Sequence, residues 1–275
     1  MGLRIATNIS SVNAQTRLRR NSENIEKSME RMASGKRINK SSDDVAGLAI
    51  SEKMNGQIRG LNQARRNAQD GVAFVQVAEG ALNETSNIMI RVRELATQAA
   101  SDTVGETERG YLNVEVGQLL TELDRIANTT EYSGTKLLDG SAGTLDFHVG
   151  VGGSEENIIS YDAGLANATA SALDVGGMAV DTKDAAKSTL ENIDQALTKV
   201  GTMRANFGAV QSRLDKTISN NATYEENLIA AKSRIQDADM AVEASNLAKD
   251  QILQNAAVST LAQANNNTNL ALKLI

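Results

Sequence analysis

The C-terminal stretch, residues 234–275, limits the folds open to this chain more than any other part. It carries no charged residue between Asp250 and Lys273. At about 100° per residue its apolar side chains point to nearly every side of a helix, and a helix that is apolar all round has to be buried all round. One partner helix cannot provide that cover, so we expect an interface with copies of the chain and with the chain's own N-terminus. The apolar side chains concerned are Ile252, Leu253, Ala256, Ala257, Val258, Leu261, Ala262 and Ala264.

Composition excludes several other classes of protein. Glutamine, asparagine, serine and threonine interrupt the apolar residues of this stretch, which argues against a membrane span. The chain of 275 residues has a net charge of −6, which argues against nucleic acid as the main partner. It has no cysteine, and its N-terminus lacks the apolar run of a secretory signal peptide. These features predict either the cytoplasm or a dedicated export machine.

A seven-residue hydrophobic repeat runs through residues 45–100 and predicts one long helix. The chain has no proline, so nothing in the backbone interrupts such a helix. A sustained repeat of this length indicates helices that pack side by side with a gentle left-handed supercoil. Glycines in the stretch would each cost about 1 kcal/mol relative to alanine, and close approach between helices would explain them. The repeat comprises Met54, Leu61, Ala68, Val75, Leu82, Met89 and Ala96.

Similar spacings predict further helices. The first covers residues 1–40, where Leu18, Ile25 and Met32 are seven apart, Met29 lies beside them and Gly35 is a stop signal. Another covers residues 106–128. The last begins near residues 182–184 and continues without an obvious stop into the C-terminal stretch. The hydrophobic seam between the long helices is predicted to contain Met54, Leu61, Val75, Leu82, Leu119, Leu123, Ile193, Val200, Phe207 and Leu214, with the polar Asn221 in the same series.

Residues 129–182 have a different character, with glycine clusters and no helical period. Leu145 and Phe147 alternate with polar residues, as do Ile159 and Tyr161, and a glycine-containing loop separates the two runs. This pattern predicts a β-hairpin. We therefore expect a mainly α protein, in which long heptad-patterned helices form a coiled-coil or bundle rod. A small central β-hairpin region interrupts it, and the N- and C-terminal helices pair, which places both termini at one end.

The sequence offers little for catalysis. His148 is the single histidine and falls in a predicted strand, and no HExxH motif or phosphate-binding glycine motif is present. The carboxylate pairs Asp43-Asp44 and Glu155-Glu156 lack a metal-ligand set, and a helix cap and a solvated loop account for them better. We expect no enzymatic activity, no cofactor and no metal site.

Both ends of the chain resemble bacterial flagellin. The resemblance rests on two extended runs, SGKRINKSSDDVAGLAISEKMNGQIRGLNQARRNAQDGVAFVQVAEGALNETSNIMIRVRELATQAASDT and RIQDADMAVEASNLAKDQILQNAAVSTLAQAN. The middle does not match in detail, and it has room only for the hairpin region. The chain therefore resembles a minimal flagellin with little or no outer variable domain.

The resemblance implies a structural subunit that polymerises into the flagellar filament used for motility. It implies that residues 1–42 and 234–275 form an inner-tube coiled coil, and that residues 43–233 form a rod domain with the hairpin insertion at about 129–182. It also implies export by the flagellar type III apparatus, a chaperone on the C-terminal segment, filament cap and hook-junction partners, and an extracellular filament. We expect both ends to become helical only on assembly. The residues expected to pack in the inner tube are Ile25, Met29, Met32, Leu247, Ile252, Leu253, Val258 and Leu261.

One segment has a second interpretation. Residues 90–96 form a helix face on any account. In flagellins that resemble this chain, the same segment is recognised by a Toll-like receptor of innate immunity. The motif match assigns receptor contacts to Arg91, Leu95 and Glu115.

Three alternatives remain open at this point. A hook–filament junction protein also has ends that resemble flagellin. A helical signalling rod, such as a chemoreceptor cytoplasmic domain, would show similar heptads but would need a membrane span or receptor partner. An enzyme with helical arms is disfavoured by the missing catalytic groups.

Overall fold

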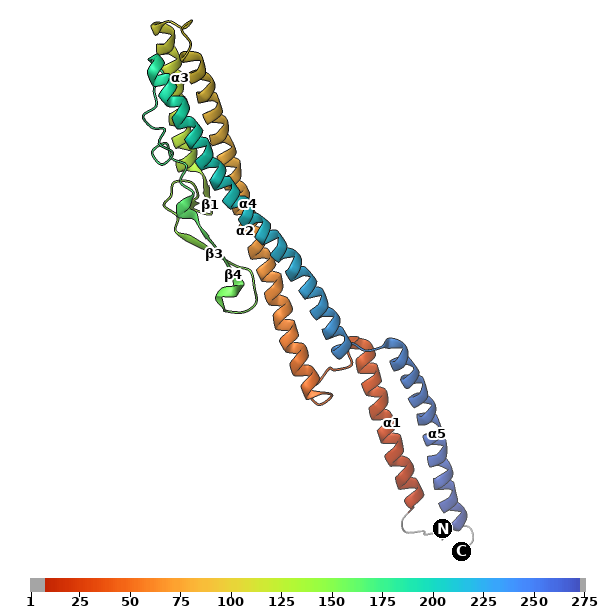
Figure 1. The fold of residues 1–275 in the computed structure, drawn as a ribbon. Coiled ribbons are helices and arrows are strands. Elements are labelled where there is room, and N and C mark those ends of the chain that lie inside the picture. Colours follow the sequence, from red (N-terminus) through yellow and green to blue (C-terminus); the bar gives the residue numbers. More distant parts are fainter. Residues whose placement is uncertain (1–7, 273–275) are drawn as a thin grey trace. The chain divides into compact units, whose positions relative to one another are not determined.

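The computed structural model describes residues 8–272, and side chains as far as residue 266. The described chain is mainly helical and divides into two compact units, here called the terminal unit (residues 8–58 and 226–272) and the central unit (residues 59–225). Figure 1 shows the elements in chain order. The α-helices are α1 (Ile9–Ser34), α2 (Val45–Ala99), α3 (Glu106–Thr129), α4 (Lys183–Gln236) and α5 (Met240–Leu272). The strands and 3-10 helices are β1 (Glu131–Tyr132), β2 (Thr135–Lys136), β3 (Thr144–His148), η1 (Glu155–Asn157), β4 (Ile158–Asp162) and η2 (Ala163–Leu165).

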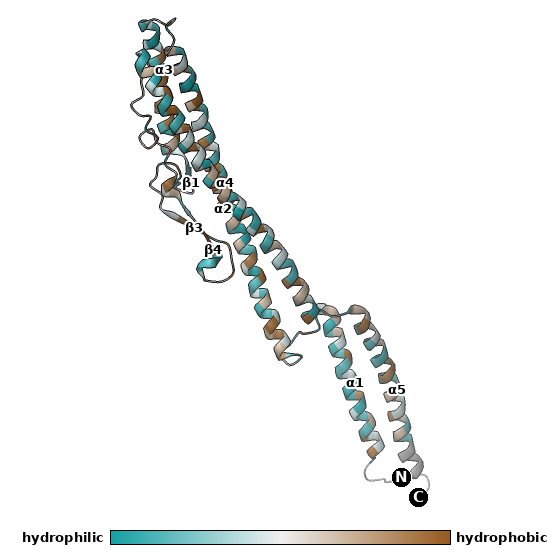
Figure 2. Cartoon of the chain, in the orientation of Figure 1, coloured by the Kyte–Doolittle hydropathy of each residue, from teal (hydrophilic) through white to brown (hydrophobic). Residues whose placement is uncertain are grey.

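The central unit has a continuous hydrophobic core between α2, α3 and α4. Along α2 and α4, hydrophobic and hydrophilic residues alternate as a heptad pattern requires (Figure 2). The largest fully buried side chains include Phe207, Leu82 and Met89. On α3 the buried stripe is Val116, Leu120, Leu123 and Ala127, so it is rotated slightly from the predicted seam, and Leu119 is half-buried.

Arg109 fixes the turn between α2 and α3. Its Nε donates to the Ala99 carbonyl at 2.8 Å and its guanidinium also donates to the Ser101 carbonyl at 3.0 Å. These carbonyls lie at the C-terminus of α2, where a helix leaves acceptors unpaired and favours positive charge. The side chain therefore stabilises both the end of α2 and the antiparallel start of α3.

The predicted hairpin is present as β3 and β4. The strands pair antiparallel, with Leu145 opposite Tyr161 and Phe147 opposite Ile159. The sequence reading missed a second, shorter hairpin formed by β1 and β2. Its two-residue turn places Ser133 at φ 52° and Gly134 at φ 81°, which is the left-handed backbone that tight hairpin turns require.

The β3–β4 hairpin is fastened to both long helices. The Asn67 side chain of α2 donates to the His148 carbonyl at 2.9 Å, and the Asn221 side chain of α4 donates to the Val149 carbonyl at 2.8 Å. A Cβ added to Gly60 would lie 2.9 Å from a methyl of Val151. This α2 glycine therefore makes room for the hairpin rather than for a second helix.

The expectation that the last long helix runs unbroken into the C-terminal stretch is wrong. α4 ends at Gln236 and α5 begins at Met240. The Asp239 carboxylate accepts from the backbone N–H groups of Ala241 at 2.9 Å and Val242 at 3.2 Å, so it caps α5. The connecting residues pair with the end of α1, because the Ala238 N–H donates to the Gly35 carbonyl at 3.0 Å. A capping aspartate and a tertiary contact, rather than proline or glycine, end the helix here.

The Asn221 contact yields a stability prediction. Replacing Asn221 by alanine leaves the Val149 carbonyl without its buried donor, and we expect a loss of about 1–3 kcal/mol in the free energy of unfolding. Urea unfolding of the isolated chain measures it. Asn220→Ala, at the exposed neighbouring position, is the matched control and should change stability by less than about 0.5 kcal/mol. Equal losses in the two variants would show that the carboxamide does not fasten the hairpin.

Candidate assembly interface

In the terminal unit, α1 and α5 lie side by side and run antiparallel (Figure 1). Polar side chains join them along their length. The Ser11 hydroxyl donates to the Asn265 carboxamide oxygen at 3.0 Å, and the Gln254 side chain donates to the Ser22 hydroxyl at 3.2 Å. An ion pair joins Arg31 to Glu243 at 3.1 Å. The predicted pairing of the N- and C-terminal helices is thus confirmed.

The contact between these helices is built mainly from small and polar residues. Buried α1 residues are Ser11, Ala14, Ile25 and Ser28. On α5, the least exposed positions recur at alternating spacings of four and three, as in a heptad seam. Several of these positions are polar, so burying this seam removes little apolar surface from water. The α5 seam consists of Glu243, Leu247, Asp250, Gln254, Ala257, Leu261 and Ala264.

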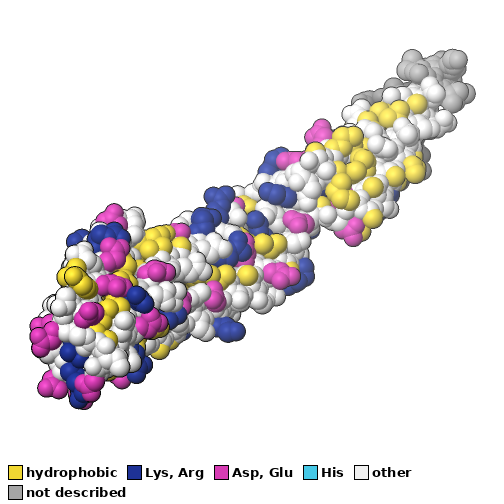
Figure 3. All heavy atoms as spheres, turned by 90° about the horizontal axis from the view of Figure 1, so that it is seen from above, with side chains coloured by type: hydrophobic (Ala, Val, Ile, Leu, Met, Phe, Trp, Pro, Cys, Tyr) yellow, Lys and Arg dark blue, Asp and Glu magenta, His cyan; other side chains and the backbone are white. Residues whose placement is uncertain are grey.

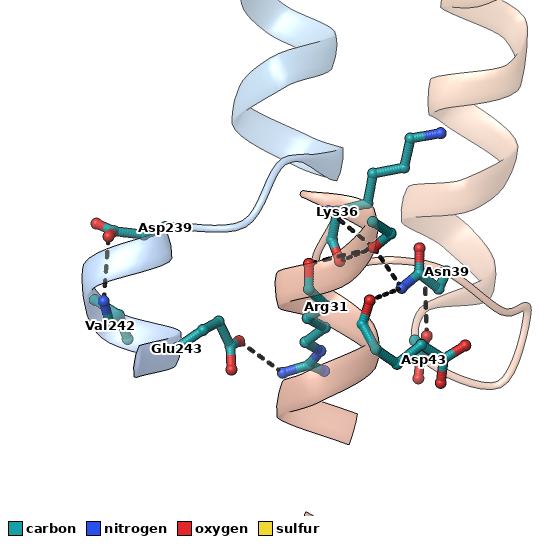
Figure 4. A network of polar contacts seen from close by, with 9 residues as sticks. Arg31, Lys36, Asn39, Asp43, Asp239, Val242 and Glu243 are labelled. Atoms are coloured by element: carbon teal, nitrogen blue, oxygen red, sulfur yellow. Dashed lines mark hydrogen bonds and ion pairs between the residues drawn. The ribbon is translucent and has the colours of Figure 1, made fainter. Parts of the chain in front are cut away.

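Glu243 is the polar residue buried most deeply in this seam. Its side chain is 9% exposed, one oxygen binds Arg31, and Oε2 is buried with no hydrogen-bond partner. The carboxylate lies in the first turn of α5, where the helix dipole favours negative charge. Figure 4 shows the ion pair beside the Asp239 cap. The pair fixes the register of α1 against α5 at the cost of a buried charge.

The turn after α1 is ordered by a second carboxylate in the same view (Figure 4). The Asp43 side chain accepts from the backbone N–H groups of Lys40 at 3.0 Å and Asn39 at 3.1 Å. These hydrogen bonds, first that of Lys40, lower the pKa of the Asp43 carboxyl below its ordinary value. Asn39 also donates to the Ser34 hydroxyl at 2.8 Å. The linker between α1 and α2 is therefore a defined turn.

Large apolar side chains lie outside this helix pair. On α5, Ile252 is 68% exposed, Val258 51% and Leu253 43%. On α1, Met29 is 50% exposed. Figure 3 shows hydrophobic side chains gathered on the visible face of the terminal helices. An exposed apolar patch of this kind marks an interaction site.

The structure separates the residues predicted to pack in an inner tube. Ile25 is buried, Met32, Leu247 and Leu261 are half-buried, and Met29, Ile252, Leu253 and Val258 are exposed. Their joint packing in a filament stays a prediction, as does the expectation that both ends become ordered only on assembly. In the rod seam, Met54 and Leu119 are half-buried. The buried members of that seam are Leu61, Val75, Leu82, Leu123, Ile193, Val200, Phe207 and Leu214.

The three residues matched to receptor contacts have different environments. Arg91 bonds Glu115 at 2.8 Å and Glu94 at 3.0 Å, with half of its side chain exposed. These hydrogen bonds, first that to Glu115, raise the pKa of the Arg91 guanidinium. Leu95 is 2% exposed and belongs to the core. A partner on this surface would therefore meet Arg91 and Glu115, and receptor recognition stays a prediction.

Within residues 8–272, no helix is both long and apolar enough to cross a membrane. Across the same residues, no group of three or more histidine, cysteine, aspartate or glutamate side chains is placed to hold a metal ion. His148 lies on the exposed side of β3. The sequence did not lead us to the Asp239 cap or to the buried Glu243. For Asp239, a signal was available, because an aspartate just before an apolar helical stretch is a typical helix cap.

Two family models match the chain. The bacterial flagellin N-terminal helical region matches residues 5–143, and the bacterial flagellin C-terminal helical region matches residues 190–275. A flagellin of Halalkalibacterium halodurans is 43% identical over 270 residues, with 98% of each chain covered. Flagellin FlaB2 of Treponema pallidum is 39% identical over 280 residues, again with 98% of each chain covered. The crystal structure of Bacillus cereus flagellin is 29% identical with a TM-score of 0.50, covering 57% of this chain and 88% of that chain.

The register of α1 against α5 is testable because the chain has no cysteine. With Ser11 and Asn265 both replaced by cysteine, the contact between their side chains predicts a disulfide under mild oxidation. Non-reducing electrophoresis of the folded or assembled protein measures the yield. Ser11→Cys with Asn255→Cys is the matched control, because ten residues of helix separate the two asparagines by about 15 Å. Equal yields from both pairs would contradict the register.

Proposed function

This chain belongs to the bacterial flagellin family, and from that premise we infer that it is a structural subunit of the flagellar filament. It is a short flagellin, in which only residues 144–189 separate the two family-matched regions, and it lacks an outer variable domain. One observation carries the inference at the level of residues. The α1–α5 contact is built mainly from small and polar residues, whereas Ile252, Leu253 and Val258 are left outside it. A surface of this kind is stabilised when another copy covers it.

The free energy gained by covering these side chains is comparable with the cost of association. Burial of Ile252, Leu253 and Val258 would contribute roughly 5–9 kcal/mol at about 1.5–3 kcal/mol each, as an upper bound. Association costs about 4–15 kcal/mol in lost translational and rotational freedom. The two quantities are comparable, so the terminal helices alone would give marginal association. Contacts of the central unit must add to them.

The two helices of the pair present unlike outer faces. The outer face of α1 carries the charged residues Arg19, Arg20, Glu23 and Lys27, all exposed. α5 is uncharged from residue 251 to its end. In a filament, the uncharged face of α5 would have to meet a different surface of the next copy, because heterologous contacts that do not close into a ring extend as a helical polymer.

We propose that residues 1–42 and 234–275 form the inner tube and residues 43–233 the surrounding rod domain; residues 1–7 and 273–275 lie outside the described structure. Before assembly, the exposed α5 residues would need cover, which supports binding of an export chaperone to the C-terminal segment. We further propose export by the flagellar type III apparatus and contacts with the filament cap and hook-junction proteins. Flagellins are structural proteins, and we propose no enzymatic activity for this one. Receptor recognition through Arg91 and Glu115 would be incidental to this role.

Replacing Ile252 by asparagine tests the assembly role of α5. The side chain is 68% exposed, so we expect the free energy of unfolding of the monomer to change by less than about 0.5 kcal/mol. Burial in the polymer would lose about 1.5–3 kcal/mol, which corresponds to a critical concentration roughly 10- to 100-fold higher. Sedimentation of polymer grown on seeds measures it.

Leu165→Asn is the control for this experiment. Leu165 lies in η2 and is 66% exposed, so the exchange removes a similar apolar surface outside the terminal helices. Its critical concentration should stay within about threefold of the parent protein. An unchanged critical concentration for Ile252→Asn would show that this face of α5 is not covered in the polymer.

A further inference from the structure

A polar cleft in the central unit is not explained by the packing of the chain itself. It lies between the β3–β4 hairpin and α4 and has a volume of about 490 Å³. Arg213, Lys216, Thr217 and Asn220 line it from α4. Glu156 and Asn157 line it from the hairpin loop. Every one of these residues belongs to the central unit, so the cleft is formed within one compact body.

The walls of the cleft are held in place by hydrogen bonds. The buried Asn221 carboxamide binds the Val149 carbonyl at 2.8 Å, and the Val149 N–H donates to the Asn157 carbonyl at 2.8 Å. Gly150 has no side chain at the point where the Asn157 side chain crosses it, and a Cβ there would collide with the carboxamide. The loop is therefore fixed over α4, and the cleft is a built feature of the fold.

Arg213 and Lys216 at the cleft form no ion pair among the described residues, although Glu156 places a carboxylate in the same lining. Arg213 and Lys216 are three residues apart on α4, so they lie on neighbouring turns of one helix face. Both are exposed. A guanidinium with hydroxyl and carboxamide groups beside it is suited to bind a carboxylate, which arginine can hold with two parallel hydrogen bonds.

Carboxylates without an ion-pair partner lie at the other end of the same unit. Glu106 and Glu108 are exposed in the first turn of α3, and no ion pair involving either is present among the described residues. Lys183 binds Asp102 at 2.6 Å, which holds the start of α4 at this turn. Acidic and basic side chains are both visible on this end of the unit in Figure 3. From Asn67, which holds the hairpin, to Ala99 at the turn, α2 spans about 48 Å at 1.5 Å per residue.

We propose that the cleft receives the acidic turn of a second copy, with Glu106 and Glu108 of one subunit facing Arg213 and Lys216 of the next. The two halves of this contact lie at opposite ends of one unit, so repeating it joins subunits head to tail in a single direction. Such a contact is heterologous and open, as a filament requires. The proposal rests on the inferred filament role and adds the longitudinal contact between subunits. An exposed ion pair adds little affinity by itself, but reversing the charges on one side of this contact would place four like charges opposite one another, which opposes association.

A charge exchange tests the contact. The variants are Arg213→Glu with Lys216→Glu, Glu106→Lys with Glu108→Lys, and all four changes together. Full-length proteins are polymerised at low ionic strength with a crowding agent, and the critical concentration is measured by sedimentation. Each double variant should raise the critical concentration at least tenfold, and the fourfold variant should return it to within about threefold of the parent. The differences should shrink as salt is added.

A matched control exchanges a pair that lies within one helix. Arg125 binds Glu122 at 2.6 Å on α3, so Glu122→Arg with Arg125→Glu keeps the internal pair and should polymerise like the parent. Thermal unfolding followed by circular dichroism checks that each monomer is folded. If the folded fourfold variant is as impaired as the double variants, or the double variants polymerise normally, the proposed contact is wrong.

Inorganic phosphate separates an anion site from a contact between subunits. Phosphate that binds saturably at Arg213 and Lys216 while the double variants still polymerise normally would identify the cleft as a site for a free anion, and would overturn the proposal. Competition is the expected result, in which phosphate raises the critical concentration of the parent more than an equal ionic strength of chloride. A parent protein that forms no filament at all would instead count against the filament role itself.

Discussion

The structure of the terminal unit depends on the difference between the apolar surface that α5 exposes and the mainly polar contact that α1 makes with it. α5 has apolar residues on all sides, but the seam it shares with α1 contains Glu243, Asp250 and Gln254. Hydrogen bonds and one ion pair fix the register, and they contribute little net free energy because water would satisfy the same groups. The hydrophobic effect, which is the main driving force for helix packing, is therefore left for contacts outside the chain.

The central unit shows the opposite arrangement. Its helices bury Phe207, Leu82 and Met89 completely, and polar residues such as Asn221 enter the core with a partner. The two units thus differ in the kind of side chain that they bury. A central unit with its own core can fold within one chain, whereas the terminal helices keep their apolar surface available for assembly. Independent folding and an apolar surface for assembly thus belong to different parts of one polypeptide.

Much of the fold follows from periodicity in the sequence. The seven-residue repeats predicted the helices, because hydrophobic residues spaced seven apart lie along one side of a helix and have to pack against a neighbouring element. Alternating apolar and polar residues predicted the β3–β4 hairpin, because every second side chain of a strand lies on the same face. The break between α4 and α5 was not predicted, because it depends on the Asp239 cap and on a tertiary contact with Gly35, and neither interrupts the helical pattern. The β1–β2 hairpin is too short to show a period.

The candidate interface was only partly predictable. Sequence patterns indicate which helix is apolar, but not which of its faces meets α1, because apolar residues on all sides give no preferred direction. The Arg31–Glu243 ion pair and the hydrogen bonds of Ser11 to Asn265 and of Gln254 to Ser22 mark the face that meets α1, and none of these pairings can be read from one helix alone. The cleft at Arg213 and Lys216 depends on a hairpin loop folded over α4 from about sixty residues away in sequence, and no local pattern reports such a contact.

The most direct test of this account is hydrogen exchange along α5, compared between the isolated monomer and the assembled polymer. The account predicts fast exchange of the α5 amides in the monomer and strong protection in the polymer, with the core helices of the central unit protected in both. A monomer that stays soluble and unassembled at high concentration with seeds present, and in which α5 is already as protected as α3, would contradict it.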